Sequence, residues 1–167
     1  MEKPFVLVVD DDPFFRRFCT DTLTKAGLEV KTASNGSEAL RICAEEPVAL
    51  VVVDVYMPEM SGIEILEAIK SQRPSVDVVV TTGYASVDTA VQALKKGASD
   101  YLRKPFAAEE LVAAVGNIIA QRRLFQDNEE LRSQLRLYEL SRSFAAVEEP
   151  LRVAVLGVDA LREISGA

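Results

Sequence analysis

The sequence predicts an α/β fold built on a doubly wound, five-stranded parallel sheet. Short runs rich in β-branched residues alternate with segments of helical spacing along the first two thirds of the chain. Several of these runs are apolar on consecutive residues, as expected for strands that helices cover on both faces. Five strands alternating with five helices are typical of this class. The expected strands are residues 5–9, 30–33, 50–54, 76–82 and 100–102.

Turn and capping residues bound the predicted helices between these strands. Gly27 and Pro47 end the first two, and Pro74 follows the third. Ser86 is a plausible N-cap for the fourth helix, and Gly97 is its expected stop. The helices are therefore expected at residues 15–26, 36–46, 62–72 and 86–96, with the fifth opening near residue 107.

Polar residues gather at the ends of the predicted strands. Asp10 and Asp11 follow the first strand, Asp54 ends the third, Thr82 ends the fourth, and Lys104 comes soon after the fifth. In a doubly wound sheet the ligand site lies outside the carboxyl ends of the strands. Carboxylates that converge there need positive partners. Lys104 and a bound divalent cation would supply them.

The chemistry of this cluster favours Mg²⁺ and phosphoryl transfer. Carboxylates without histidine or paired cysteine suit Mg²⁺, which takes one or two of them and keeps several waters. A carboxylate can also act as a nucleophile and form an aspartyl-phosphate, whose oxygens a metal and a lysine neutralise. Asp54 is the best candidate for this nucleophile because it stands alone at the end of a central strand.

Four segments resemble the signatures of the response-regulator receiver domain of two-component signalling. They are "VLVVDDDP", "VVVDVYMPEMSG", "VVVTTGYAS" and "DYLRKPF". The resemblance covers about residues 4–123, within a predicted receiver domain of residues 1–123, and implies a flavodoxin-like sheet with strand order 2-1-3-4-5. It makes Asp54 the phosphoacceptor. It also implies a Mg²⁺ site formed by Asp10, Asp11, Asp54 and the backbone carbonyl of Tyr56.

The same resemblance implies a conformational switch and a partner. Thr82 takes the position of the switch hydroxyl and Tyr101 that of the switch aromatic residue. Lys104 is the lysine of the family, and the Lys104–Pro105 peptide bond is expected to be cis, which proline permits. A sensor histidine kinase would donate the phosphoryl group, because this chain has no histidine of its own.

Two other functions are alternatives to this one. A Mg²⁺-dependent phosphohydrolase with an aspartate nucleophile would carry its motif at the end of the first strand. Here that strand ends in "DDDPFF", which has Pro13 at the position where the motif has a small or hydroxyl residue. A phosphorylation-independent interaction module is disfavoured because every site residue is present. We therefore expect a phosphoacceptor with at most slow self-dephosphorylation, not an enzyme.

The segment 117–144 contains no Gly or Pro, so the fifth helix is expected to run past the domain. Apolar residues and one asparagine recur there at alternating steps of four and three, which predicts a coiled-coil seam and a parallel homodimer. A solvated helix that packs back on its own domain is the alternative. The seam consists of Leu124, Asn128, Leu131, Leu135 and Tyr138.

The last segment, 145–167, gives a weaker signal. Pro150 is expected to end the helix, and residues 151–164 are compatible with a strand or a short helix. The chain is either a stand-alone regulator or the N-terminal fragment of a longer one.

Composition limits the remaining possibilities. A net charge of −7 argues against nucleic-acid binding by this chain. No apolar run approaches the roughly 20 residues that cross a membrane. Neither a signal peptide nor a metal-ligand cysteine spacing is evident, so Cys19 and Cys43 are expected to be free thiols in a cytoplasmic protein.

Overall fold

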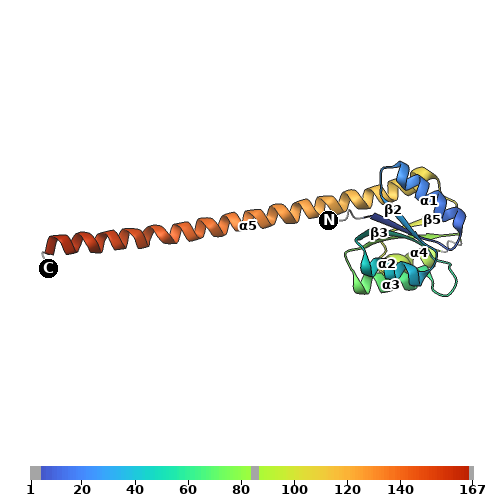
Figure 1. Ribbon diagram of the computed structural model, residues 1–167, viewed down its shortest axis with the longest axis horizontal. Helices are drawn as coiled ribbons and strands as arrows, with labels where there is room; N and C mark the ends of the chain where they lie inside the picture. The colour runs from blue at the N-terminus through green and yellow to red at the C-terminus, as the bar shows by residue number, and fades with distance from the viewer. Residues whose placement is uncertain (1–4, 84–86, 166–167) are drawn as a thin grey trace. The chain divides into compact units, whose positions relative to one another are not determined.

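The computed structural model describes residues 5–83 and 87–165, with side chains through Arg142 except at position 87. Its centre is a five-stranded parallel sheet with the order β2-β1-β3-β4-β5 (Figure 1). The predicted fold class and strand order are confirmed. The strands are β1 (Phe5–Val9), β2 (Val30–Ala33), β3 (Val48–Asp54), β4 (Asp77–Thr82) and β5 (Asp100–Arg103).

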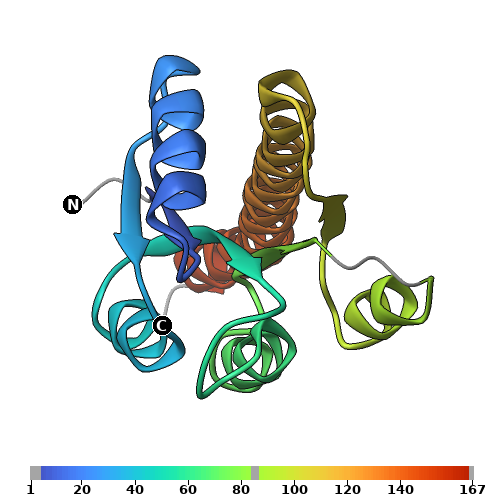
Figure 2. The same cartoon turned by 90° about the vertical axis from the view of Figure 1, so that its right-hand side faces the viewer.

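Five helices cover the two faces of the sheet. α1 and the first turns of α5 lie on one face, whereas α2, α3 and α4 lie on the other (Figure 2). The helices are α1 (Pro13–Lys25), α2 (Gly36–Glu45), α3 (Gly62–Gln72), α4 (Val87–Lys95) and α5 (Ala108–Ser165).

β1 is apolar throughout because both of its faces are buried. In β1, Val6 and Val8 join the core under α1 and α5, and the alternate residues Leu7 and Val9 join the core under α2 and α3. This alternation is the period of two that an extended strand imposes. All five residues of β1 are buried.

The register between β1 and β3 decides what meets at the strand ends. Val9 pairs with Val53 across the two parallel strands. The next residues along each strand are Asp10 and Asp54, so the register brings two carboxylates to the same edge of the sheet. On the other side of β3, Asp54 pairs with Thr81 of β4.

Polar side chains begin the helices that flank this edge. The Asp12 carboxylate accepts a hydrogen bond from the backbone N–H of Phe14 and caps α1, whose first residue is proline. Ser61 and Glu64 form a reciprocal capping box at the start of α3. The predicted N-cap of α4, Ser86, lies outside the described residues.

The prediction that the helix ends at Pro150 is wrong. α5 runs from Ala108 to Ser165, so residues 151–165 are helical and the alternative of a strand there is excluded. A proline removes one backbone hydrogen bond and crowds the preceding turn, at a cost of about 3 kcal/mol. The helix continues on both sides of Pro150, so this local cost does not end it.

The chain forms two compact units, Met1–Ala120 and Gln121–Ala167. The sheet, the first four helices and the first turns of α5 make up the first unit, and the rest of α5 makes up the second. The predicted subdivision into residues 1–123, 117–144 and 145–167 stays a prediction. Within the described ranges, no helix has the length and hydropathy to cross a membrane.

Candidate functional site

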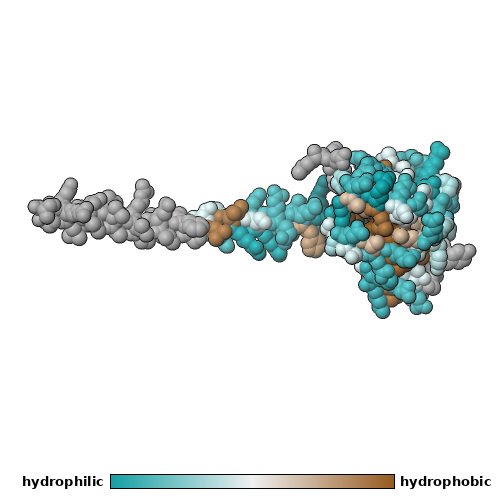
Figure 3. Space-filling model, turned by 60° about the horizontal axis from the view of Figure 1, so that its bottom comes forward, coloured by the Kyte–Doolittle hydropathy of each residue, from teal (hydrophilic) through white to brown (hydrophobic). Residues whose placement is uncertain are grey.

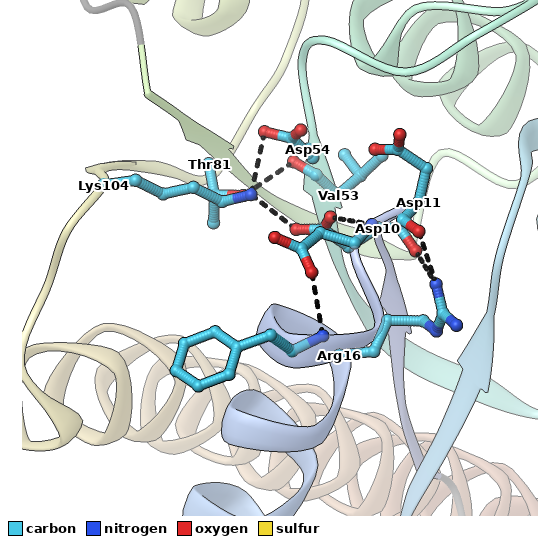
Figure 4. A network of polar contacts seen from close by, with 9 residues as sticks. Asp10, Asp11, Arg16, Val53, Asp54, Thr81 and Lys104 are labelled. Atoms are coloured by element: carbon cyan, nitrogen blue, oxygen red, sulfur yellow. Dashed lines mark hydrogen bonds and ion pairs between the residues drawn. The ribbon is translucent and has the colours of Figure 1, made fainter.

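Three carboxylates meet at the carboxyl end of the sheet. One oxygen from each of Asp10, Asp11 and Asp54 lies within 4.8 Å of the others (Figure 4). Asp10 and Asp54 are only 4% and 7% exposed, whereas Asp11 is open to solvent. The β1–β3 register produces this grouping, as the strand ends predicted. Hard oxygen donors that are partly buried and partly open are the donor set that Mg²⁺ takes in proteins.

Lys104 brings a positive charge into the carboxylate cluster. Its Nζ donates a hydrogen bond to Asp10 Oδ2 at 2.5 Å and lies 3.3 Å from Asp54 Oδ1. The side chain of Lys104 is 10% exposed. Its backbone N–H donates to the carbonyl of Thr82 at 2.8 Å, which fixes the start of the loop after β5 beside the end of β4. The Lys104–Pro105 peptide bond is cis.

Asp54 is the least satisfied member of the cluster. Among the described side chains, its Oδ1 is buried without a hydrogen bond, because the contact with Lys104 has ion-pair distance but not hydrogen-bond geometry. Burial raises the pKa of Asp54 from 3.8 to about 6, Lys104 opposes this shift, and the nearby Asp10 charge adds to it. A buried acceptor in this state is stabilised by any cation or donor that reaches it.

The shifted pKa predicts a specific pH dependence of stability in the metal-free protein. Folding holds the Asp54 proton more tightly than the unfolded chain does, because the pKa rises from 3.8 to about 6. The stability from this proton is present below pH 4 and is lost as the pH rises through 6, by on the order of 2–3 kcal/mol. Urea denaturation of wild type and Asp54→Asn between pH 4 and pH 7.5 measures it. Identical pH profiles for the two proteins would contradict this expectation.

The remaining predicted residues lie around the same edge, with different exposures. Thr82 is fully buried at the end of β4, and Thr81 donates its hydroxyl proton toward the Val53 carbonyl at 3.5 Å. Tyr101 is half-buried on β5, and among the described side chains its hydroxyl oxygen is buried without a hydrogen bond. Tyr56 is 53% exposed in the loop after β3.

Two residues of α1 belong to this site although the sequence did not single them out. Arg16 Nη1 donates to the backbone carbonyl of Asp10 at 2.6 Å and to that of Asp11 at 3.0 Å, so it holds the loop that carries both carboxylates. The Phe15 ring lies near the ammonium of Lys104. No sequence signal separates these residues from their neighbours Arg17 and Phe14.

Comparison with known families identifies the family of this chain. The family model described as the response regulator receiver domain matches residues 6–116. The chain belongs to the response-regulator receiver family. The predicted family and the predicted role in two-component signalling are therefore confirmed, and receivers act there as phosphoacceptors. The roles of individual residues in this receiver stay predictions.

Curated relatives and a solved structure agree with this membership. The receiver is 37% identical over 132 residues to a putative NtrX-like response regulator of Rickettsia bellii, which covers 78% of this chain and 28% of the relative. It is 38% identical over 120 residues to the DNA-binding transcriptional regulator NtrC of Escherichia coli, covering 72% and 26%. The chain thus spans less than a third of the length of these curated relatives.

Among solved structures, a response regulator receiver domain protein from Clostridium thermocellum has a TM-score of 0.69 at 38% identity. The match covers 74% of this chain and 99% of that one. The similarity to solved structures therefore concerns a complete receiver domain and confirms the fold.

Proposed function

We propose that this receiver takes a phosphoryl group on Asp54 from a sensor histidine kinase and changes conformation in response. The observation that carries the proposal is the unsatisfied, buried Oδ1 of Asp54 beside two further carboxylates and Lys104. The Asp54 oxygen would attack phosphorus while the bond to the histidine nitrogen of the donor breaks. We expect the aspartyl-phosphate to be lost slowly. The receiver would then act as a phosphoacceptor and not as an enzyme with turnover.

The donor set supports a Mg²⁺ ion at this site. Three carboxylates within 4.8 Å of one another, balanced by a single ammonium, leave excess negative charge that a divalent cation would neutralise. Asp11 and Asp54 would hold the ion directly, and Asp10 and the backbone carbonyl of Tyr56 would complete its surroundings. When bound, Mg²⁺ supplies electrostatic stabilisation of the phosphoryl oxygens.

Lys104 and Thr82 are the proposed protein partners of the phosphoryl oxygens. Lys104 is already held at the carboxylates, so its ammonium needs little rearrangement to meet a phosphoryl group on Asp54. Thr82 sits at the end of the strand next to β3 and can contribute a hydroxyl donor. Both residues would then stabilise the phosphorylated state more than the free state.

Tyr101 is the proposed readout of that change. Its ring packs against the core on the side of α2, α3 and α4, and its buried hydroxyl has no hydrogen bond within the described part of the chain. Burial also raises the pKa of this hydroxyl, so it stays protonated near neutral pH. A tyrosine that is half-buried and unsatisfied can occupy a second orientation, and phosphorylation would shift the balance between the two.

The proposal is tested by mass measurement after reaction with a small phosphoryl donor. The purified chain is incubated with acetyl phosphate, with and without Mg²⁺, and its intact mass is recorded over time. A stable gain of one phosphoryl group that requires Mg²⁺ supports the phosphoacceptor role. Continuous release of phosphate from phosphate esters without a phosphorylated chain would favour a phosphohydrolase instead.

We also propose that the chain forms a parallel homodimer through α5. Four of the five predicted seam residues are apolar and more than half exposed in the described part of this helix: Leu124 is 64%, Leu131 56%, Leu135 55% and Tyr138 63% exposed. Apolar residues interrupt an otherwise hydrophilic helix surface (Figure 3). A second copy would cover this stripe, and Asn128 would fix the register. We further propose that the protein is located in the cytoplasm and that this chain does not bind nucleic acid.

A seam substitution is expected to weaken the dimer, whereas the same change off the seam is not. Truncation after Arg123 removes the seam, and Leu135→Asp places a charge at a buried a/d position. Each change should raise the dissociation constant at least about tenfold. Leu137→Asp is the matched control, since Leu137 is 65% exposed and lies outside the seam. Sedimentation equilibrium compares wild type with the truncated chain, Leu135→Asp and Leu137→Asp. A monomeric wild type at high micromolar concentration, with or without phosphorylation, would defeat the coiled-coil hypothesis.

A further inference from the structure

Lys104 has an aromatic neighbour in addition to its two carboxylate partners. Its Nζ lies 4.2 Å from the centre of the Phe15 ring, which projects from the first turn of α1. Phe15 is half-buried, and the lysine side chain is 10% exposed. The Phe15 ring and the two carboxylates therefore surround the Lys104 ammonium group together.

Other aromatic rings hold the Phe15 ring in place. The rings of Phe15 and Phe106 lie 6.4 Å apart between centroids, and those of Phe18 and Phe106 lie 6.0 Å apart. Phe106 is 7% exposed and follows Lys104 by two residues. This cluster ties α1 directly to the loop that carries the lysine.

The physical effect of the ring on the ammonium is attraction and exclusion of water. The face of an aromatic ring carries partial negative charge and attracts a cation within about 6 Å of its centre. A leucine of similar bulk would exclude water but would not attract the charge. The attraction grows when the cation is desolvated, as it is for a lysine whose head group is buried among carboxylates.

We propose that Phe15 is a positioning residue for phosphorylation: its ring face keeps the Lys104 ammonium at the Asp10 and Asp54 carboxylates. This inference rests on the proposed function, because it concerns the lysine that would meet the phosphoryl oxygens. Without the ring, the ammonium exchanges more freely with solvent and spends less time where phosphoryl transfer needs it. Phe15 touches no reacting atom and acts only through Lys104.

Three variants separate attraction from packing. Phe15→Leu removes the ring and keeps apolar bulk, whereas Phe15→Tyr keeps the ring. Phe125→Leu makes the same change at a ring on α5 that is 75% exposed. The first readout is the solvent-exchange rate of the Lys104 ammonium protons by ¹⁵N NMR of the unphosphorylated full chain, with the signal assigned from Lys104→Arg. The second is the rate of phosphorylation by acetyl phosphate with Mg²⁺, followed by intact mass.

Phe15→Leu is expected to speed ammonium exchange and slow phosphorylation by roughly three- to tenfold each, the range that one cation–π contact implies. Phe15→Tyr and Phe125→Leu should match wild type in both measurements. Wild-type behaviour of Phe15→Leu overturns the inference, and so does an equal defect in Phe15→Tyr, which would mean that only packing matters. If Phe15→Leu fails to fold, Phe15→Met takes its place in the same comparison.

Failure of the proposed function is distinguishable from failure of this inference. A wild-type chain that takes up no phosphoryl group refutes the phosphoacceptor role, but the NMR measurement still reports whether Phe15 holds Lys104. A wild-type chain that is phosphorylated normally, with Phe15→Leu indistinguishable from it, refutes only the role of Phe15.

Discussion

Asp54→Asn is expected to abolish phosphoryl uptake from acetyl phosphate while leaving the fold intact. The amide has the shape of the carboxylate, but its oxygen is a poor nucleophile and carries no charge to offer a cation. Asp54 is 7% exposed beside Asp10 and Asp11, so the substitution also removes a buried negative charge. The metal-free variant should therefore be at least as stable as wild type near neutral pH. Intact mass measures the first effect and urea denaturation the second.

The control for this experiment is the same chemical change at a carboxylate outside the site. The Asp21 side chain on α1 is 59% exposed and its Oδ2 lies 3.8 Å from Arg17 Nε, so Asp21→Asn should be phosphorylated like wild type. Uptake by Asp54→Asn at the wild-type level would refute the assignment of the phosphoacceptor. Loss of uptake in both variants would point to a general defect in the assay or the protein.

Gly62→Ala is expected to produce the largest loss of stability among glycine-to-alanine changes at the described glycines. A Cβ at this position would lie 2.1 Å from the backbone carbonyl oxygen of Asp54 and 2.8 Å from its carbonyl carbon. The Gly62 N–H also donates to the carbonyl of Val55 at 2.9 Å, so the start of α3 is bound to the end of β3. Since the clash involves backbone atoms, relief requires the Asp54 loop to move, at a cost of about 3 kcal/mol or more.

Gly116→Ala is the matched control because it adds the same methyl group where there is room for it. Nothing lies within 4 Å of a Cβ at Gly116, which sits inside α5. Alanine there should be neutral or stabilise the protein by about 0.5–1 kcal/mol. Urea denaturation compares the two variants with wild type, and phosphorylation rates report whether Asp54 has moved. Wild-type stability of Gly62→Ala would show that the two elements are not locked together.

The architecture and the centre of the site were predictable because their signals are local or follow from topology. Valine-rich runs marked the strands, and the rule that sites lie at the carboxyl ends of parallel strands grouped Asp10, Asp54 and Lys104 although they are distant along the chain. The structure places Lys104 Nζ 2.5 Å from Asp10 Oδ2 and 3.3 Å from Asp54 Oδ1. Resemblance to receivers then supplied roles that residue types alone do not.

The features that escaped prediction depend on tertiary context. Phe14 and Phe15 are adjacent residues of the same type. Phe14 is 71% exposed, whereas Phe15 contacts Lys104, because the rotation of α1 relative to the sheet decides which ring turns inward. Arg16 and Arg17 differ for the same reason. The local effect of Pro150 predicts a helix stop, but α5 continues on both sides of this residue.

The two outer strands of the sheet have a consequence for how copies of this protein can meet. β2 and β5 are only four residues long and carry charged side chains, among them the exposed Lys31 and Arg103. Lys31 is also engaged in an ion pair with Glu46. Short, charged outer strands resist the backbone-to-backbone addition of a further strand, which is the first step of fibrous aggregation. The unpaired backbone groups along the outer edges of β2 and β5 are thereby protected against such pairing, although the described sheet ends at these two strands.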